Sequence, residues 1–177
     1  MNYGQIYYAD VANGTGCRTS LFVSGCTHHC RDCFNEMTWD FDYGEPFTEA
    51  VEDRVIESLK PVYISGLTLL GGEPMELRNQ GAVCHLLERV RSEVPHANVW
   101  IYSGYSYEEL IDPGNGRCHG EYTDRILGMA DILVDGEFDY TKKDLRLKFR
   151  GSSNQRIIRV PETLKTGQIV LSELNCQ

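Results

Sequence analysis

The stretch LTLLGGEPMELRNQGAVCHLLERVRSEVPHANVWIYS, residues 67–103, decides the fold of this chain. It begins with the apolar run 67–70 and ends with residues 98–103, and both runs are typical of buried strands. Four apolar side chains recur between them at the spacing of one helical face: Val83, Leu86, Leu87 and Val90. Residues 80–93 are therefore predicted to form a helix that joins two parallel strands.

The same alternation of strands and helices is expected along most of the chain. Further strands are expected at residues 20–24, 132–134 and 157–160, with a possible strand at 169–171. Further helices are expected at residues 48–60, 106–111 and 123–129. Strands that are apolar throughout predict a mainly parallel sheet covered by helices. A complete (β/α)8 barrel takes about 250 residues. We therefore expect an α/β fold, namely an open, incomplete (β/α) barrel with mainly parallel strands, or alternatively a doubly wound sheet.

The size and charge of the chain restrict its class. Its 177 residues are enough for one domain, so residues 1–177 are expected to form a single domain. The formal net charge is −9, with 17 Lys and Arg against 26 Asp and Glu, which argues against direct binding of nucleic acid. No apolar run is long enough to span a membrane, and the first residues lack the features of a signal peptide. We expect a cytoplasmic protein without a membrane partner.

A second stretch, SGCTHHCRDCFNE at residues 24–36, holds three of the seven cysteines. The spacing of Cys26, Cys30 and Cys33 lets three thiolates converge on one metal centre. Iron–sulfur cubanes usually have four Cys ligands, so a set of three leaves one iron for a small chelating molecule. Strand candidates precede both this loop and Gly71-Gly72, and ligands of such sheets bind at the carboxyl ends of the strands. The two motifs should therefore meet at one edge of the sheet.

Two alternatives compete with an open cluster. The first is a zinc site with His28 or His29 as the fourth ligand, and the second is an electron-transfer cluster completed by a distant cysteine. Zinc modules usually contain a second, distant pair of ligands, and no other His residue of this chain lies in such a pair. The sequence therefore favours a metal centre with one open position.

The cysteine spacing resembles the signature of the radical S-adenosylmethionine superfamily. Within it, seven motifs resemble the activating proteins of anaerobic ribonucleoside-triphosphate reductase: NGTGCR (13–18), SLFVSGC (20–26), CFN (33–35), GGEP (71–74), YSGY (102–105), LVDGEF (133–138) and RGSSNQR (150–156). Asp32 precedes the third cysteine, where the superfamily often has an aromatic residue, and the activating proteins are similar in this respect. The resemblance covers a core of about residues 3–160, without the surface loop 113–120 and the C-terminal tail 161–177.

The resemblance implies a set of site residues. All three cysteines of the motif would ligate one [4Fe-4S] cluster, and the amino and carboxylate groups of S-adenosylmethionine would chelate the remaining iron. Asp32, Cys33 and Phe34 would line this cofactor, and Gly72 would approach its methionine end. Glu73, or carbonyl groups beside it, would accept hydrogen bonds from its amino group. No catalytic residue beyond the cluster ligands is expected.

The function implied by the resemblance is activation of the anaerobic reductase. Reductive cleavage of S-adenosylmethionine would give methionine and a 5′-deoxyadenosyl radical, which would abstract hydrogen from a glycine of the large reductase subunit to form a glycyl radical. The implied partners are this large subunit and a reduced flavodoxin or similar electron donor. Alternatives are activation of another glycyl-radical enzyme or modification of a small molecule by the same chemistry, and a zinc-binding interaction protein without catalysis.

The other four cysteines match no ligand spacing. Cys84 lies on the flank of the helix 80–93 and is expected to be buried as a small apolar side chain. Cys118 and Cys176 lie outside the resemblance and are expected to be exposed thiols. Cys17 precedes an arginine in a glycine-rich segment, and no role is expected for its thiol.

Four further side chains and one loop border predicted strands. Tyr102 and Tyr105 follow a strand, where core packing is the default and a place near the adenosine of the cofactor is the alternative. Asp131 and Asp135 bracket a strand and are expected to be solvated or to cap a helix. Residues 150–156 are expected to form a polar loop at the edge of the active site or at a partner surface.

Overall fold

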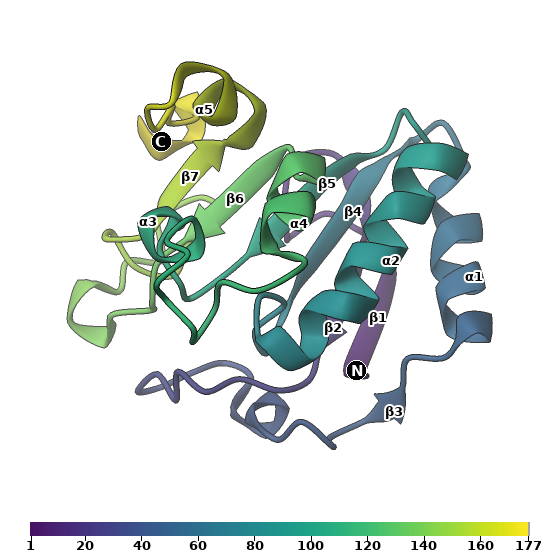
Figure 1. Ribbon diagram of the computed structural model, residues 1–177, viewed down its shortest axis with the longest axis horizontal. Helices are drawn as coiled ribbons and strands as arrows, with labels where there is room; N and C mark the ends of the chain where they lie inside the picture. The colour runs from purple at the N-terminus through teal and green to yellow at the C-terminus, as the bar shows by residue number, and fades with distance from the viewer. Residues whose placement is uncertain (177) are drawn as a thin grey trace.

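The computed structural model describes residues 1–176, which form a seven-stranded mixed sheet with helices packed against it (Figure 1). The strands are β1 (Asn2–Asp10), β2 (Cys17–Val23), β3 (Glu45–Pro46), β4 (Ile64–Gly71), β5 (Asn98–Tyr102), β6 (Ile132–Asp135) and β7 (Arg156–Arg159). The α-helices are α1 (Glu49–Leu59), α2 (Leu77–Glu93), α3 (Tyr107–Leu110), α4 (Thr123–Met129) and α5 (Val160–Thr166). The short 3-10 helices are η1 (Glu36–Trp39), η2 (Tyr140–Lys142) and η3 (Glu173–Cys176).

The sheet has the strand order β3-β1-β2-β4-β5-β6-β7, and its two edge strands are not paired with each other. Neighbouring strands β2, β4, β5 and β6 run parallel, whereas β1, β3 and β7 join antiparallel toward the edges. These findings confirm an α/β fold with an open sheet that is parallel in its middle. The curvature of an incomplete barrel stays a prediction.

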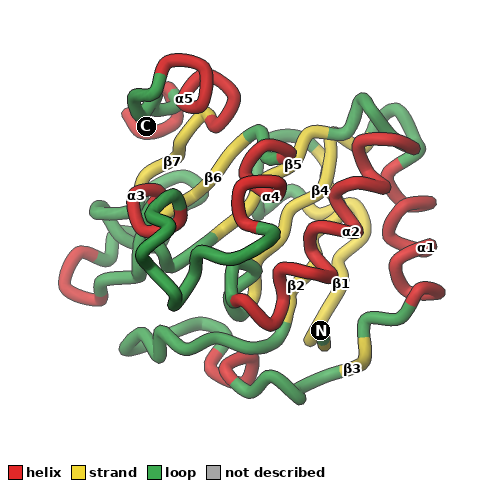
Figure 2. The backbone as a smooth tube through the Cα atoms, in the orientation of Figure 1, coloured by secondary structure: helices red, strands yellow, loops and turns green. Residues whose placement is uncertain are grey.

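Helices α1, α2 and α4 lie on one face of the sheet, as the helices in Figure 2 show. The four apolar side chains of the predicted helical stripe are all buried: Val83, Leu86, Leu87 and Val90. Cys84 on the same helix is buried too, as predicted. The predicted helices at residues 48–60, 106–111 and 123–129 are present as α1, α3 and α4. Among the described residues, no helix is long and apolar enough to cross a membrane.

The register between β2 and β4 positions the two sequence motifs. Val23, the last residue of β2, lies opposite Gly71, the last residue of β4. Gly71 has a φ of 104°, a conformation that favours glycine, so the chain turns sharply where β4 ends. The cysteine loop follows β2 and the GGEP motif follows β4 at the same edge. The prediction that these motifs meet is thereby confirmed.

Two expectations about the C-terminal half are wrong. Cys118 is fully buried rather than exposed, because the loop 113–120 packs onto the core and Gln80 donates a hydrogen bond of 2.7 Å to the Cys118 carbonyl. The possible strand at residues 169–171 is reduced to a single isolated bridge between Leu171 and β7. Cys176 is exposed, as predicted.

Arg18 on β2 is fully buried, and within residues 1–176 no carboxylate forms an ion pair with its guanidinium. Its charge is instead solvated by five oxygen atoms: Thr68 Oγ1 at 2.7 Å, Leu67 O at 2.8 Å, Thr15 O at 3.1 Å, and Asn98 Oδ1 and O at 2.7 and 3.2 Å. Burial lowers the pKa of Arg18 to about 10, which leaves the side chain charged at neutral pH. This cation thus ties β2 to β4, to β5 and to the loop after β1.

Replacing Arg18 with Ala should destabilise the fold strongly, because five buried or half-buried acceptors lose their donor and a cavity remains. We expect the free energy of unfolding to fall by on the order of 3–4 kcal/mol. Denaturant unfolding of the metal-free protein measures this loss. Arg54→Ala, on the exposed side of α1, is the matched control and should change stability by less than about 0.5 kcal/mol. An equal, small effect of both substitutions would contradict this interpretation.

Candidate metal and cofactor site

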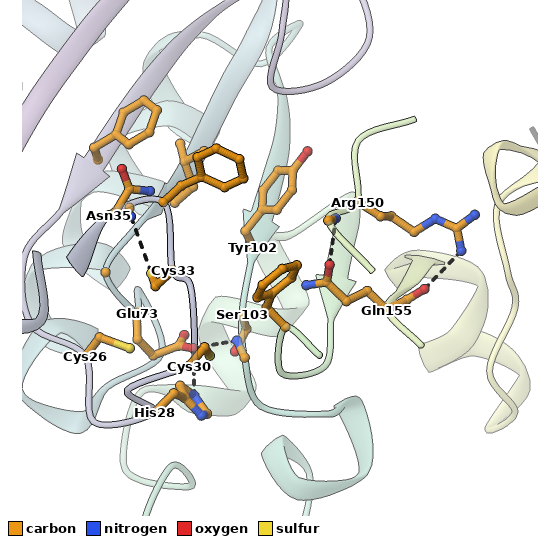
Figure 3. A pocket seen from close by; sticks show the side chains of 18 of the residues that line it. Cys26, His28, Cys30, Cys33, Asn35, Glu73, Tyr102, Ser103, Arg150 and Gln155 are labelled. Carbon is orange, nitrogen blue, oxygen red and sulfur yellow. Dashed lines mark hydrogen bonds and ion pairs between the residues drawn. The ribbon is translucent and has the colours of Figure 1, made fainter. Parts of the chain in front are cut away.

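A cavity of about 500 Å³ lies at the carboxyl ends of the parallel strands (Figure 3). Phe22 and Leu70 line it, whereas their neighbours Leu21 and Leu69 belong to the hydrophobic core. Since successive side chains of a strand point to opposite faces, the cavity lies on the sheet face away from α1 and α2. The cavity is therefore separate from the hydrophobic core beneath α1 and α2. The sheet forms one of its walls, and loops form the other.

All three cysteines of the motif line this cavity. Cys26 is buried directly after β2, and Cys30 and Cys33 are half-buried farther along the same loop. The backbone N–H of Asn35 donates to Cys33 Sγ at 3.4 Å. The four other cysteines do not line the cavity, so the structure gives no support to a cluster completed by a distant cysteine.

The thiols face one space but are not gathered at one point. Among residues 1–176, no group of three or more His, Cys, Asp or Glu side chains is arranged so that it could hold a metal ion. Burial raises the pKa of Cys26 to about 12 and that of Cys30 to about 11, so both thiols are neutral at pH 7 and metal binding must displace their protons. Three soft ligands on one cavity wall fit an iron–sulfur cluster with one open position.

Backbone hydrogen bonds and one buried carboxylate fix the start of the cysteine loop. The N–H of Gly25 donates to Thr38 O at 2.8 Å, which ties the loop to η1. The N–H and hydroxyl of Thr27 both donate to Glu76 Oε1, at 2.8 and 2.6 Å. Glu76 is buried just before α2. Cys26 therefore lies in a segment held on both sides by the core.

The His28 side chain is buried in the loop, with 4% of it exposed. Its Nε2 lies 3.2 Å from Glu73 Oε2, and its ring packs against Tyr105 at 4.3 Å between centroids. His29 instead packs edge-on against Trp39, at 4.6 Å. Both histidines are thus used in packing, and neither joins the cysteines in a zinc site among the described residues.

The GGEP motif packs directly against the cysteine loop. The N–H of Gly72 donates to Val23 O, and the N–H of Glu73 donates to Gly25 O, both at 2.8 Å. A Cβ on Gly72 would lie 2.7 Å from Gly25 O and 2.9 Å from Thr38 O. The close contact between the GGEP turn and the cysteine loop is therefore enough to require glycine at position 72. The approach of Gly72 to the cofactor stays a prediction.

Both oxygens of the Glu73 carboxylate accept hydrogen bonds from the protein. Its Oε1 accepts from the N–H of Met75 at 2.8 Å, and its Oε2 accepts from the N–H of Gly104 at 2.6 Å as well as contacting His28. The side chain is 1% exposed. It joins the GGEP turn to the cysteine loop and to the turn after β5. A hydrogen bond from the cofactor amino group to Glu73, or to carbonyl groups beside it, stays a prediction.

The other predicted cofactor residues differ in position. Phe34 lines the cavity with 81% of the residue exposed, so its ring is free to cover a ligand. Asp32 is exposed, with a φ of 57°, and does not line the cavity.

The two tyrosines at and after the end of β5 differ in position. Tyr102 lines the cavity, whereas Tyr105 is fully buried in the core. From the loop 150–156, three residues reach the cavity: Arg150, Gly151 and Gln155.

The two aspartates that bracket β6 are structural. Asp135 is fully buried, so the expectation of solvation is wrong, but its carboxylate accepts from the N–H of Tyr107 at 2.7 Å and so does cap α3. It also forms an ion pair with Arg156 of β7. Asp131 accepts from the N–H of Val99 and from Arg91, both at 2.7 Å. Both side chains hold neighbouring elements together at β6.

Sequence reasoning did not find Thr27, Glu76 or the structural use of His28. Their partners lie 45 to 49 residues away in the chain, and the pairs form only because β2 and β4 end side by side. No local spacing marks such a pair. The one available signal was the polar content of the cysteine loop beside an otherwise apolar strand end.

Comparison with known proteins shows the family to which this chain belongs. Residues 12–158 match the family described as a 4Fe-4S single cluster domain, which covers well over half of the chain. The chain is 42% identical to the anaerobic ribonucleoside-triphosphate reductase-activating protein of Vibrio cholerae over 161 residues, which are 90% of this chain and 98% of that protein. It is 40% identical to that of Escherichia coli K12 over 157 residues, covering 88% and 96%. The corresponding protein of Enterobacteria phage T4 is 34% identical, covering 89% and 93%. The chain belongs to the family of anaerobic ribonucleoside-triphosphate reductase-activating proteins.

Proposed function

We propose that this protein activates an anaerobic ribonucleoside-triphosphate reductase by forming a glycyl radical on its large subunit. The observation that carries the proposal is that three cysteines, and no fourth among residues 1–176, line one cavity beside the GGEP turn. Membership in the activating-protein family supports the same function and the same partner. A reduced flavodoxin or a similar carrier is the proposed electron donor.

Cys26, Cys30 and Cys33 would hold a [4Fe-4S] cluster, and Phe34 and Gly72 would contact S-adenosylmethionine. Asp32 is proposed as a further contact on the resemblance alone, since it does not line the cavity. Cluster and cofactor together supply a carbon-centred radical by reductive cleavage of a carbon–sulfur bond.

The chain's own contribution is to position ligands and to exclude water. Four apolar side chains from β2, β4 and the segment after β6 form part of the cavity wall: Phe22, Leu70, Phe138 and Phe149. Such walls protect a reactive intermediate from solvent. The Thr27–Glu76 and His28–Glu73 contacts hold the cysteine loop over these walls. No side chain is assigned an acid–base step.

The remaining proposals concern the whole molecule. One hydrophobic core cluster draws on residues from Leu21 to Val160, which supports a single domain. The open sheet with a cavity on its face away from α1 and α2 is compatible with an incomplete (β/α) barrel. A cytoplasmic location and the absence of nucleic-acid and membrane partners stay predictions.

The test is anaerobic reconstitution with iron and sulfide, followed by incubation with S-adenosylmethionine, a reductant and the purified reductase. We expect 5′-deoxyadenosine and an electron paramagnetic resonance signal of a glycyl radical that depends on the reductase. Replacing the target glycine of the reductase with alanine is the matched control and should remove the radical signal. A protein that binds one zinc and no sulfide would contradict the proposal. Radical formation only on a different glycyl-radical enzyme would assign it another partner.

A further inference from the structure

Positive charge is concentrated in one short part of this acidic chain. Residues 142–150, here called the basic segment, hold five of the chain's 17 Lys and Arg residues and a single acidic residue, Asp144. Lys142 pairs with the preceding Asp139, and Arg146 pairs with Asp144, both at 2.8 Å. With five basic residues and one acidic residue, the segment carries a formal charge of +4 on a molecule whose net charge is −9.

The basic segment and the residues just before it lie against the cysteine loop. Figure 1 draws both at the end of the molecule away from α1. Three pairs of residues join them: Lys143 Nζ with the Phe34 ring at 5.4 Å, the Arg31 guanidinium with the Tyr140 ring at 4.7 Å, and Cys30 Sγ with Glu137 Oε1 at 3.8 Å. A partner bound to the basic segment would therefore lie next to the cysteines.

Exposed apolar side chains accompany these charges. Phe34 is 81% exposed and Leu145 is 86% exposed. The side chain of Arg146, which follows Leu145 in the chain, is 91% exposed. Exposed apolar side chains beside arginine and lysine are typical of a protein–protein interface. The surface thus has the composition of a docking site for a protein of opposite charge.

We propose that the basic segment, together with Phe34, is the docking surface for an acidic one-electron carrier protein. The inference rests on the proposed function, in which one electron passes from the reduced carrier, which is thereby oxidised, to the iron–sulfur cluster, which is thereby reduced. A carrier that cannot enter the cavity must approach the cysteines from outside. The cysteine loop has no excess of positive charge, because Asp32 and Glu36 outnumber Arg31. The attraction therefore comes from the basic segment, while the acidic remainder of the surface repels the carrier and orients it.

The test reverses the charge of three residues that do not line the cavity: Lys143→Glu, Arg146→Glu and Lys148→Glu together. The rate of 5′-deoxyadenosine formation by the reconstituted protein is measured with reduced flavodoxin and, separately, with dithionite. At low salt we expect the flavodoxin-driven rate to fall about tenfold or more, because like charges now face each other. The dithionite-driven rate and the iron and sulfide content should stay at the wild-type values.

A matched control carries the same change of charge elsewhere: Arg54→Glu, Lys60→Glu and Lys165→Glu, on α1, after α1 and on α5. This variant should keep its flavodoxin-driven rate within about twofold, and only the wild type and this control should lose rate as salt is raised. Equal losses in both triple variants, or a loss with dithionite, would overturn the proposal. So would a variant that makes 5′-deoxyadenosine normally with either donor but no glycyl radical, since the surface would then belong to the reductase. A wild type inactive with dithionite would instead overturn the proposed function.

Discussion

Alanine in place of Cys26, Cys30 or Cys33 is expected to abolish the cleavage of S-adenosylmethionine in each case. The cavity offers three thiols and no fourth, so the loss of any one leaves the cluster short of protein ligands. We expect less than about 1% of the wild-type rate of 5′-deoxyadenosine formation, together with a large loss of bound iron. The rate and the iron and sulfide content are measured after identical anaerobic reconstitution.

Cys84→Ala and Cys118→Ala provide the matched controls, because both thiols are buried in the core and neither lines the cavity. Each removes one thiol and should leave iron content and cleavage near wild type, with a modest loss of stability from the smaller side chain. Full cleavage activity in any one of the three ligand variants would contradict the assignment. Loss of iron in Cys84→Ala would do the same.

Gly72→Ala is expected to separate the two motifs that build the site. The added Cβ would lie within 3.0 Å of two backbone oxygens, on Gly25 and Thr38, and backbone cannot move aside as a side chain can. We expect a destabilisation on the order of 1–3 kcal/mol and a marked loss of cluster uptake, because the start of the cysteine loop shifts. Thermal unfolding and iron content after reconstitution measure the two effects.

Gly128→Ala is the control for this substitution. Gly128 lies in α4, and a Cβ there would meet no atom within 4 Å. Alanine favours the helix by up to about 1 kcal/mol, so stability should be unchanged or slightly higher and iron content should be that of the wild type. If Gly72→Ala behaves like Gly128→Ala, the close packing of the GGEP turn on the cysteine loop is not as described.

The sequence alone was sufficient to predict a helix or strand where one local pattern of residues determines that element. The stripe Val83–Val90 specified α2, and the apolar runs before Cys26 and Gly71 located β2 and β4. From these followed the parallel middle of the sheet and the edge at which the motifs meet. Such elements can be predicted because burial of one face requires apolar residues at a regular spacing in the sequence.

Other features depend on contacts that no local pattern reveals. β1 was not predicted, because this strand, which lies between β2 and the two-residue edge strand β3, mixes half-buried and exposed residues and includes Tyr7 and Tyr8, each about half exposed. The burial of Cys118 depends on a loop that the carbonyl contact with Gln80 holds to the core. The burial of Arg18 depends on acceptors from three other parts of the chain.

The most direct measurement of the central claim is electron–nuclear double resonance on the reduced, reconstituted protein with S-adenosylmethionine carrying ¹⁵N in its amino group and ¹⁷O in its carboxylate. We predict that both labels couple to the cluster spin, because the protein supplies three ligands and the cofactor supplies the rest. A fully loaded [4Fe-4S] cluster that shows no coupling to either label would contradict the account.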